Sequence, residues 1–528
     1  MTSNITPKTS KSWLSDKEEV AFIDVREIGQ HTSGHPFFSV SIQYSLFELK
    51  IETLVPNKKT RVILIDNNDG ISKLAYNVAH KLGYSNIFII DGGIEGWVNA
   101  GYQLFDGINV PSKSFGELIE KHFHTPSITA KDLIKKQDNN ENCIVIDGRP
   151  FEEYNKMSIP KSICCPNAEL LYRVSSHVKD INTEIIINCA GRTRSIIGAQ
   201  TLIDFGIKNK VRALENGTQG WFLSDLSLEH NKTEYLAVNP TDIEIQKLQN
   251  KVLKLTDYLN IDLIDFEEAQ ELIIDKNRST FIFDVTTSKK INNTQDVIMN
   301  VPGGQLVQAT DKYIGVWKAT VILVDDGDLI RAGTTSFWLK KMGFKVYILK
   351  EGLLKAKKLK FQKEVSSKII NLHSITLEDL GRVKNQALYD IRPSSEFCKT
   401  RIKNSIWLNR ASLNKQNINM DDQIVIITDK LDKASLVIRD LRGMDKEVTV
   451  KVYKWNQSEI KNCGPIIDKT TKPLSEQNNI DFNFHTHMRH KGNKEHAKQY
   501  LEWEINLVEK MDEQELSFFK LYQTNFNS

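Results

Sequence analysis

The sequence predicts an α/β protein made of four tandem copies of one small unit, each a parallel sheet with helices on both faces. Three observations lead to this prediction. Short, almost continuously apolar runs recur along the chain, amphipathic helix patterns separate them, and the same order of runs and turns returns four times. Strands that are apolar on both sides are typical of parallel sheets whose two faces are covered by helices.

Length and composition limit the number of domains, the partners and the compartment that the chain can have. At 528 residues the chain is too long for one hydrophobic core. Its 70 basic and 67 acidic side chains leave a net charge of +3, so no overall field recruits nucleic acid or an anionic membrane. No apolar stretch approaches the roughly 18 residues of a membrane span, and no signal segment precedes the first unit. We therefore expect a cytoplasmic protein with neither nucleic-acid nor membrane partners.

The cysteine pattern points to a reducing compartment. The 6 cysteines are too sparse for a disulfide framework and contain no C-x-x-C pair. Four histidines near the C-terminus lack a patterned thiol or acidic ligand, and we interpret them as part of a solvated basic segment: His485, His487, His490 and His496. We expect neither a bound metal nor a cofactor.

Each unit begins with a short strand that ends in an aspartate, and three of the four continue as Asp-x-Arg. These aspartates are Asp24, Asp147, Asp284 and Asp390. Roughly forty residues later a second apolar run follows, and the loop directly after it opens with Asp66, Cys189, Asp325 and, in the fourth unit, Thr428 or Asp429. Loops at the carboxyl ends of parallel strands form the active sites of such sheets, so these four positions correspond to one another.

A helix and a third strand complete each unit. In the first unit the apolar positions from Leu74 to Leu82 recur at helical spacing, and Gly83 stands where a left-handed C-cap belongs. The run 87–90 is again a buried strand. The first two units also share a Gly-x-x-Gly-Trp ending, which marks them as clear copies, at Trp97 and Trp221.

The predicted boundaries follow from these repeats. We place the units at residues 8–106, 124–228, 259–358 and 372–466, and a helical tail at residues 485–528. The segments between units are polar and lack the repeat pattern, and we interpret them as linkers, roughly 107–126, 229–258, 355–372 and 464–485. Residues 243–259 are expected to form a connecting helix, and residues 495–522 a helix that packs through its apolar side.

Cys189 is the candidate nucleophile. It opens the loop Cys189-Ala190-Gly191-Arg192-Thr193-Arg194-Ser195, which lies between an apolar strand and the start of a helix. A helix N-terminus and nearby guanidinium groups both favour a thiolate over a thiol. The loop is therefore suited to hold an anion-facing nucleophile.

Several motifs of the second unit resemble the rhodanese homology domain. They are Asp147-x-Arg149, Glu152-Glu153-Tyr154, Ile159-Pro160, the Cys189 loop and the Asn-Gly-x-x-Gly-Trp ending at Trp221. Fainter copies of the pattern cover the other three units. As a whole the chain resembles the multi-domain rhodanese-related sulfurtransferases of bacteria.

The resemblance implies sulfur transfer through a persulfide on Cys189. It implies that the successive backbone N–H groups from Ala190 to Ser195 help to hold the transferred sulfur. Arg192 and Arg194 would pair with a small anionic sulfur donor, and a thiol or a protein would be the sulfur acceptor. Asp147 and Arg149 would support the neighbouring strand end, although direct contact with the substrate stays open. The oligomeric state is also open.

The sequence departs from the pattern of thiosulfate enzymes at one position. Those enzymes carry a basic residue directly after the cysteine, whereas this chain has Ala190 and moves its charges to Arg192 and Arg194. The loop therefore leaves two donors open, thiosulfate and a persulfide compound. Asp66 and Asp325 replace the nucleophile elsewhere, so the other three units are expected to be silent, either as scaffold or as binding sites for an acceptor or small ligand.

Cys189 has three alternative roles. It could be an ordinary buried thiol, or a non-catalytic sulfur carrier or redox sensor. It could also be the nucleophile of a phosphatase, but such loops need an arginine where this chain has Ser195. The remaining cysteines are interpreted as structural, with a resolving role for the adjacent pair left as the alternative: Cys143, Cys164, Cys165, Cys398 and Cys463.

Overall fold

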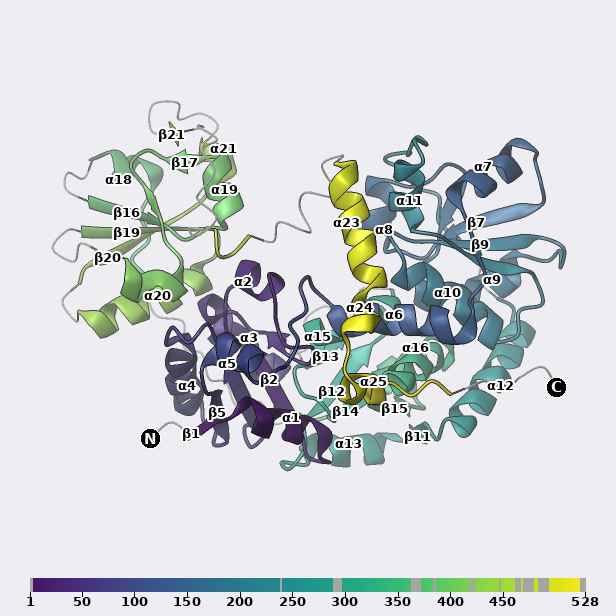
Figure 1. Cartoon of the computed structure of the whole chain (residues 1–528), viewed down its shortest axis with the longest axis horizontal. Coiled ribbons are helices and arrows are strands. Elements are labelled where there is room, and N and C mark those ends of the chain that lie inside the picture. Colours follow the sequence, from purple (N-terminus) through teal and green to yellow (C-terminus); the bar gives the residue numbers. More distant parts are fainter. Residues whose placement is uncertain are drawn as a thin grey trace.

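The computed structural model describes residues 3–237, 240–287, 297–361, 372–382, 386–416, 418, 423–445, 448–460, 467–468, 479–482 and 493–522. Within these residues four parallel sheets follow one another along the chain, each flanked by helices (Figure 1). The α/β class and the tandem arrangement predicted from the sequence are confirmed. No helix in this described part of the chain is both long and apolar enough to cross a membrane.

The first sheet contains β1 (Ser3–Ile5), β5 (Ile87–Ile90), β4 (Arg61–Ile65), β2 (Val20–Asp24) and β3 (Val40–Ser41) in that spatial order, with every neighbouring pair parallel. Strand β2, which lies next to the central strand β4, is buried along its whole length, as its apolar run predicts. Its helices are α1 (Pro7–Ser15), α2 (Ile28–Thr32), η1 (Tyr44–Leu46), α3 (Phe47–Leu54), α4 (Ile71–Lys81) and α5 (Gly93–Asn99).

The second sheet repeats this order. It contains β6 (Ser127–Ile128), β10 (Val211–Leu214), β9 (Glu184–Asn188), β7 (Cys143–Asp147) and β8 (Ser162–Cys164), again all parallel. Its helices are α7 (Ala130–Asp138), α8 (Phe151–Lys156), η2 (Asn167–Glu169), α9 (Leu170–His177), α10 (Thr193–Asp204) and α11 (Gly217–Leu223). The central position of β9 places the loop that follows it in the middle of the sheet's carboxyl edge.

The third sheet has the same topology and the fourth a reduced form of it. The third contains β11 (Asp262–Ile264), β15 (Lys345–Leu349), β14 (Thr320–Val324), β12 (Thr280–Asp284) and β13 (Ile298–Asn300). Its helices are α13 (Phe266–Ile274), α14 (Gly303–Gln308), α15 (Thr310–Tyr313), α16 (Ile330–Lys341) and α17 (Gly352–Ala356). The fourth has four strands, β18 (Ile406–Trp407), β16 (Gln386–Asp390), β19 (Gln423–Thr428) and β20 (Val450–Lys454).

The fourth unit carries additional short elements. Its helices are α18 (Leu377–Arg382), α19 (Ser394–Lys399), η3 (Arg410–Lys415), α20 (Leu431–Met444) and α21 (Gln457–Ile460), and β17 (Arg401–Ile402) pairs antiparallel with β21 (Ile467–Asp468). Arg410 is fully buried and binds Glu48 of the first unit and Asp440 of its own. This charged contact joins the fourth unit to the first.

Two helices lie between the sheets, and the sequence analysis predicted only one of them. Helix α12 (Asp242–Tyr258) forms where a connecting helix was expected. Residues 107–126 were interpreted as a polar linker, which is wrong: they contain the 14-residue helix α6 (Val110–Phe123), with Phe115 and Ile119 fully buried. The helix is surrounded by neighbouring units, so its polar residues are buried by tertiary contacts that no local pattern reveals.

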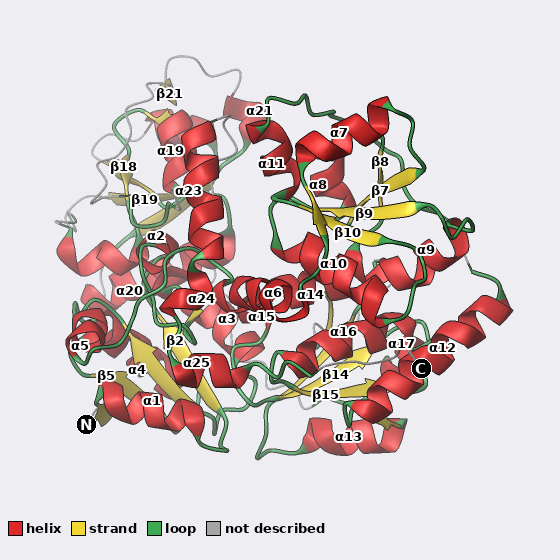
Figure 2. Cartoon of the chain, turned by 45° about the vertical axis from the view of Figure 1, so that its right-hand side comes forward, coloured by secondary structure: helices red, strands yellow, loops and turns green. Residues whose placement is uncertain are grey.

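The C-terminal tail forms three short helices rather than one long one. These are α23 (Lys494–Ile505), α24 (Leu507–Lys510) and α25 (Glu513–Phe518). The helical tail is interrupted before α25, because Asp512 and Glu515 form a reciprocal capping box that starts a new helix. Helix α24 packs against α6 near the centre of the molecule (Figure 2).

One hydrophobic core runs through the first three units. It also contains residues of α6 and α12 and the tail side chains Leu507, Met511 and Phe519. The fourth unit has separate clusters, of which one is built around Tyr389, Ile424 and Val437. The first three units and the tail are therefore packed as one body, with the Cys189 loop inside it.

A buried ion pair joins the second and third units. The Glu169 side chain is fully buried, and Arg331 donates to its two oxygens over 2.6 and 3.0 Å while Arg173 donates over 2.8 Å. Burial by itself raises the pKa of Glu169, but the hydrogen bonds and charges of the two arginines outweigh it and leave that pKa below its usual value.

We predict that Glu169→Ala lowers the free energy of unfolding by about 3–5 kcal/mol, because it leaves the Arg331 guanidinium buried without its carboxylate. Urea denaturation followed by tryptophan fluorescence measures this. Glu152→Ala, an exposed position of the same unit, is the matched control and should change stability by less than about 0.5 kcal/mol. Equal stability of the two variants would contradict a structural role for the pair.

Candidate active site

The loop after β9 places a sulfur atom at the start of a helix. Cys189 follows the strand directly, and α10 begins four residues later with Arg192 as its N-cap. The Cys189 Sγ lies 3.7 Å from the Arg192 carbonyl oxygen and 3.6 Å from the Ser195 hydroxyl. Only 2% of the residue is exposed. The loop therefore curls around the sulfur, and the helix adds partial positive charge at its mouth.

The turn at Gly217 contacts the Cys189 loop and fixes its shape. Gly217 has a φ of +53°, and a Cβ there would lie 2.2 Å from the Cys189 carbonyl oxygen. The next two backbone N–H groups donate to the loop, Thr218 to the Cys189 carbonyl over 2.8 Å and Gln219 to the Ala190 carbonyl over 3.1 Å. Only glycine allows this approach, which explains the glycine in the Asn-Gly-x-x-Gly-Trp motif.

Asp147 and Arg149 bind each other at the carboxyl end of β7. Arg149 donates to the two carboxylate oxygens over 2.8 and 2.7 Å and to the Met157 carbonyl over 2.7 Å. Asn188, the residue before Cys189, donates to the same carboxylate over 2.7 Å. The pair thus ties the β7 end to the strand that carries the cysteine.

Arg192 points toward α6 and binds its carboxylates. It donates to both oxygens of Glu117 over 2.7 Å and also pairs with Glu120. Burial opposes its charge, yet these carboxylates outweigh burial and hold the pKa of Arg192 above its usual value. Arg192 therefore links the Cys189 loop to α6.

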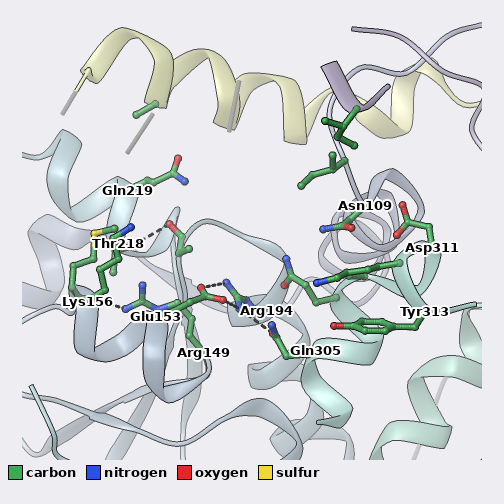
Figure 3. A pocket seen from close by; sticks show the side chains of 18 of the residues that line it. Asn109, Arg149, Glu153, Lys156, Arg194, Thr218, Gln219, Gln305, Asp311 and Tyr313 are labelled. Atoms are coloured by element: carbon green, nitrogen blue, oxygen red, sulfur yellow. Dashed lines mark hydrogen bonds and ion pairs between the residues drawn. The ribbon is translucent and has the colours of Figure 1, made fainter. Parts of the chain in front are cut away.

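Arg194 lies on the other side of the loop. It donates to Glu153 over 2.9 and 2.8 Å and to the Gln305 side chain of the third unit over 3.1 Å (Figure 3). Burial again opposes the charge, but Glu153 outweighs it, with a smaller contribution from Cys189, and raises the pKa of Arg194. Arg194 is thus electrostatically coupled to the sulfur.

A cavity of about 240 Å³ opens at the loop. Its walls include the predicted site residues from Cys189 to Arg194, whereas Ser195 contacts the sulfur from behind. The opposite wall comes from α6 and from the tail helix α23, with Lys113, Tyr500, Trp503 and Glu504. The sulfur of Cys189 therefore faces a space large enough for a small anion.

Sequence reasoning missed the residues that the tail and α6 bring to this cavity. Thr193 Oγ1 donates to Glu504 Oε1 over 2.7 Å, and the Lys113 ammonium lies 3.5 Å from the same oxygen. Glu504 is 1% exposed. These residues are distant from Cys189 in the sequence and lie outside the repeat, so no local signal marked them.

Comparisons with known proteins identify the family of the chain. Residues 6–100 and 129–224 match the model of the Rhodanese-like domain. The crystal structure of a thiosulfate sulfurtransferase from Pseudomonas aeruginosa is 30% identical, covers 98% of this chain and 99% of its own, and superposes with a TM-score of 0.87. The chain belongs to the rhodanese-like sulfurtransferase family.

Shorter solved structures align with about a fifth of this chain. A protein from Bacillus halodurans is 21% identical over 21% of this chain and 83% of its own, with a TM-score of 0.19. A rhodanese-related protein from Thermoplasma volcanium is 24% identical over 20% of this chain and 97% of its own, with a TM-score of 0.18. The search of curated proteins found no match.

In two of the other rhodanese-like units a carboxylate fills the loop that follows the central strand. Asp66 accepts from the backbone N–H groups of Asn68 and Ser72 over 2.9 and 2.8 Å. Asp325 accepts from Gly327 over 2.9 Å, from Leu329 over 3.3 Å and from Ala332 over 3.0 Å. These loops are thus satisfied internally, and neither offers a sulfur nucleophile.

The fourth rhodanese-like unit replaces the nucleophile by a hydroxyl. Thr428 exchanges hydrogen bonds with the backbone of Lys430, which closes its own turn. Asp429 is exposed. Neither residue provides a thiol.

Burial raises the pKa of three of the remaining cysteines. Cys164 and Cys165 are fully buried, and burial raises the pKa of Cys164 to about 12 and that of Cys165 well above its usual value. Burial also raises the pKa of Cys143. Cys463 and three of the four tail histidines, His485, His487 and His490, lie outside the described residues, and the described part holds no cluster of metal-ligating side chains.

We predict that Glu504→Gln raises the rate at which iodoacetamide alkylates Cys189 at pH 7 by about threefold to tenfold. The amide can still accept from Thr193, but a negative charge that disfavours the thiolate is removed from the cavity. Mass spectrometry of the Cys189 peptide measures the rate. Glu502→Gln on the exposed side of the same helix is the control, and an equal rate in both variants would argue that Glu504 does not act on the loop.

Proposed function

We propose that this protein transfers sulfane sulfur from thiosulfate or a persulfide donor to a thiol or another nucleophilic acceptor, through a persulfide on Cys189. The observation that carries the proposal is the position of the Cys189 sulfur, which lies at the N-terminus of α10 and faces a cavity of about 240 Å³. The other three units offer no thiol at the corresponding position.

In the first step the Cys189 thiolate attacks the outer sulfur of thiosulfate. A new S–S bond forms to Cys189, the bond between the two donor sulfurs breaks, and sulfite leaves with the bonding electron pair. The charge is conserved, because the thiolate becomes a persulfide anion. Arg194, which is coupled to the sulfur, is placed to stabilise the anionic donor and the leaving sulfite.

In the second step an acceptor removes the outer sulfur. A nucleophilic thiolate attacks it, the S–S bond to Cys189 breaks, and the electron pair returns to the Cys189 thiolate. Donor and acceptor react in turn, so no oxidant is consumed. Arg192, held by Glu117 and Glu120, would keep the loop in the shape that both steps need.

We predict that thiosulfate adds one sulfur atom to the intact mass of the wild-type protein, and that Cys189→Ser abolishes both the adduct and turnover with 2-mercaptoethanol as acceptor. Cys398→Ser, which changes a cysteine of the fourth unit, is the control and should keep the adduct. If the Cys189→Ser protein still gains sulfur, the nucleophile lies elsewhere.

We predict that Arg194→Ala raises the KM for thiosulfate by about tenfold or more, since a charge-assisted contact to an anion is worth roughly 1.5–3 kcal/mol. Steady-state kinetics at fixed acceptor concentration measure it, and a thermal melt shows that the fold is retained. Arg278→Ala, at an exposed position of the third unit, should leave KM unchanged. An unaltered KM in the Arg194 variant would remove this arginine from the donor site.

A further inference from the structure

Four cations around the Cys189 loop each have a carboxylate partner. The nitrogen-to-oxygen distances are 2.7, 2.7, 2.8 and 3.5 Å in the pairs Arg149–Asp147, Arg192–Glu117, Arg194–Glu153 and Lys113–Glu504. Glu120 is a second carboxylate on Arg192. The positive charges next to the sulfur are therefore largely cancelled by the protein itself.

The pairs differ in how firmly they are held. Glu117 and Arg192 are both buried, as are Glu504 and Lys113, and buried pairs are screened little by water or salt. The Glu153 side chain is 40% exposed, so solvent weakens its pair with Arg194. The compensation of Arg192 is thus a fixed part of the fold.

The carboxylates also occupy the hydrogen-bonding edges of the two arginines. Arg192 donates from Nε and Nη2 to Glu117, and from Nη1 to Asn216 over 3.4 Å. Arg194 donates from Nη1 and Nη2 to Glu153 (Figure 3). A sulfonate group that binds a guanidinium bidentately needs such an edge. An anionic donor therefore competes with carboxylates that already occupy these edges.

Sulfane donors differ in the charge that they bring to the site. Thiosulfate carries two negative charges, whereas an organic thiosulfonate carries one, and both present an outer sulfur that a thiolate can attack. The Cys189 thiolate is itself negative, so it repels either donor. Where the nearby cations are compensated, this repulsion grows with the charge of the donor. A singly charged donor is therefore admitted at a lower electrostatic cost.

From these observations we infer that Glu117 of α6 and Glu153 of α8 are specificity-determining residues that set the charge of the sulfur donor. By compensating Arg192 and Arg194 they make the site favour sulfane donors with one negative charge, as in an organic thiosulfonate, over dianionic thiosulfate. The inference rests on the sulfurtransferase function proposed above.

The favoured reaction balances without an oxidant. The Cys189 thiolate attacks the outer sulfur of the thiosulfonate, and a new S–S bond to Cys189 forms. The bond between the two donor sulfurs breaks, and a sulfinate leaves with the bonding electron pair. One negative charge enters with the donor and one leaves with the sulfinate.

The experiment compares two small donors of different charge. Thiosulfate or methanethiosulfonate is mixed in excess with the full-length protein, and the second-order rate constant of persulfide formation on Cys189 is followed by intact mass after rapid quenching. The reaction of each donor with 2-mercaptoethanol in solution is the reference for its leaving group. Relative to this reference, we expect the protein to prefer methanethiosulfonate by about fivefold or more.

Two substitutions remove the compensating charges while keeping the shape of the side chain. We expect Glu117→Gln and Glu153→Gln each to raise the rate constant for thiosulfate, relative to that for methanethiosulfonate, by about threefold or more, because a released guanidinium charge attracts the dianion more strongly. Glu152→Gln, the exposed neighbour of Glu153, is the matched control and should leave the ratio unchanged. If Glu117→Gln proves unstable in a thermal melt, the partly exposed Glu153 position decides the test.

Salt dependence tests the inference in the wild-type protein. A compensated site offers little attraction for salt to screen, so the rate constant for thiosulfate should not fall when NaCl is raised from about 50 to 300 mM. In Glu117→Gln/Glu153→Gln it should fall, since the released cations then attract the donor. A severalfold fall in the wild type would reveal uncompensated cations at the donor site and overturn the inference.

The outcomes separate the two proposals. Failure of both donors to form a persulfide overturns the sulfurtransferase function and the donor specificity with it. If both donors load Cys189 but the ratio of their rate constants is the same in the wild type, Glu117→Gln and Glu153→Gln, the donor specificity alone is overturned. A wild-type preference for thiosulfate relative to the solution reference also contradicts it.

Discussion

The structure depends on how each unit completes the loop between its central strand and the helix that follows. Backbone N–H groups at a helix start need an acceptor. In the first and third units a carboxylate from the same loop supplies it, through Asp66 and Asp325. In the second unit Cys189 takes the corresponding position, and its loop is held open by contacts from outside. One residue type at one position therefore separates a loop that satisfies its own N–H groups from the loop that carries the thiol.

Buried charges hold the reactive loop in place. Arg192 is anchored by α6, Arg194 by Glu153 and Gln305, and Thr193 by Glu504 of the tail. Removing one partner of a buried ion pair is costly, so the Arg192–Glu117 pair, which is buried on both sides, restrains the loop strongly. The charges that the sequence marks as donor-binding groups are thus structural as well. Burial of Cys189 between α10, α6 and α23 leaves only small molecules direct access through the cavity beside it.

The repeated pattern predicted the sheets well because it is a local property of the chain. Buried parallel strands are continuous apolar runs, and β2, β9 and β14 were all visible as such. Helix α6 was missed for the opposite reason. It lies outside the repeated pattern, and its Lys113 and Glu117 are buried only because partners from the tail and the Cys189 loop surround them. The tail was expected as one helix, but the cap at Asp512 divides it.

The sequence by itself determined the α/β repeat, the rhodanese-like pattern and the position of Cys189 at the start of a helix, because these depend on short-range periodicity and spacing. Only the tertiary structure decided which groups face the sulfur. Glu504 and Lys113 come from α23 and α6, which lie outside the unit that contains Cys189. Their contacts follow from the packing of three units and the tail around one core, which no local stretch of sequence encodes.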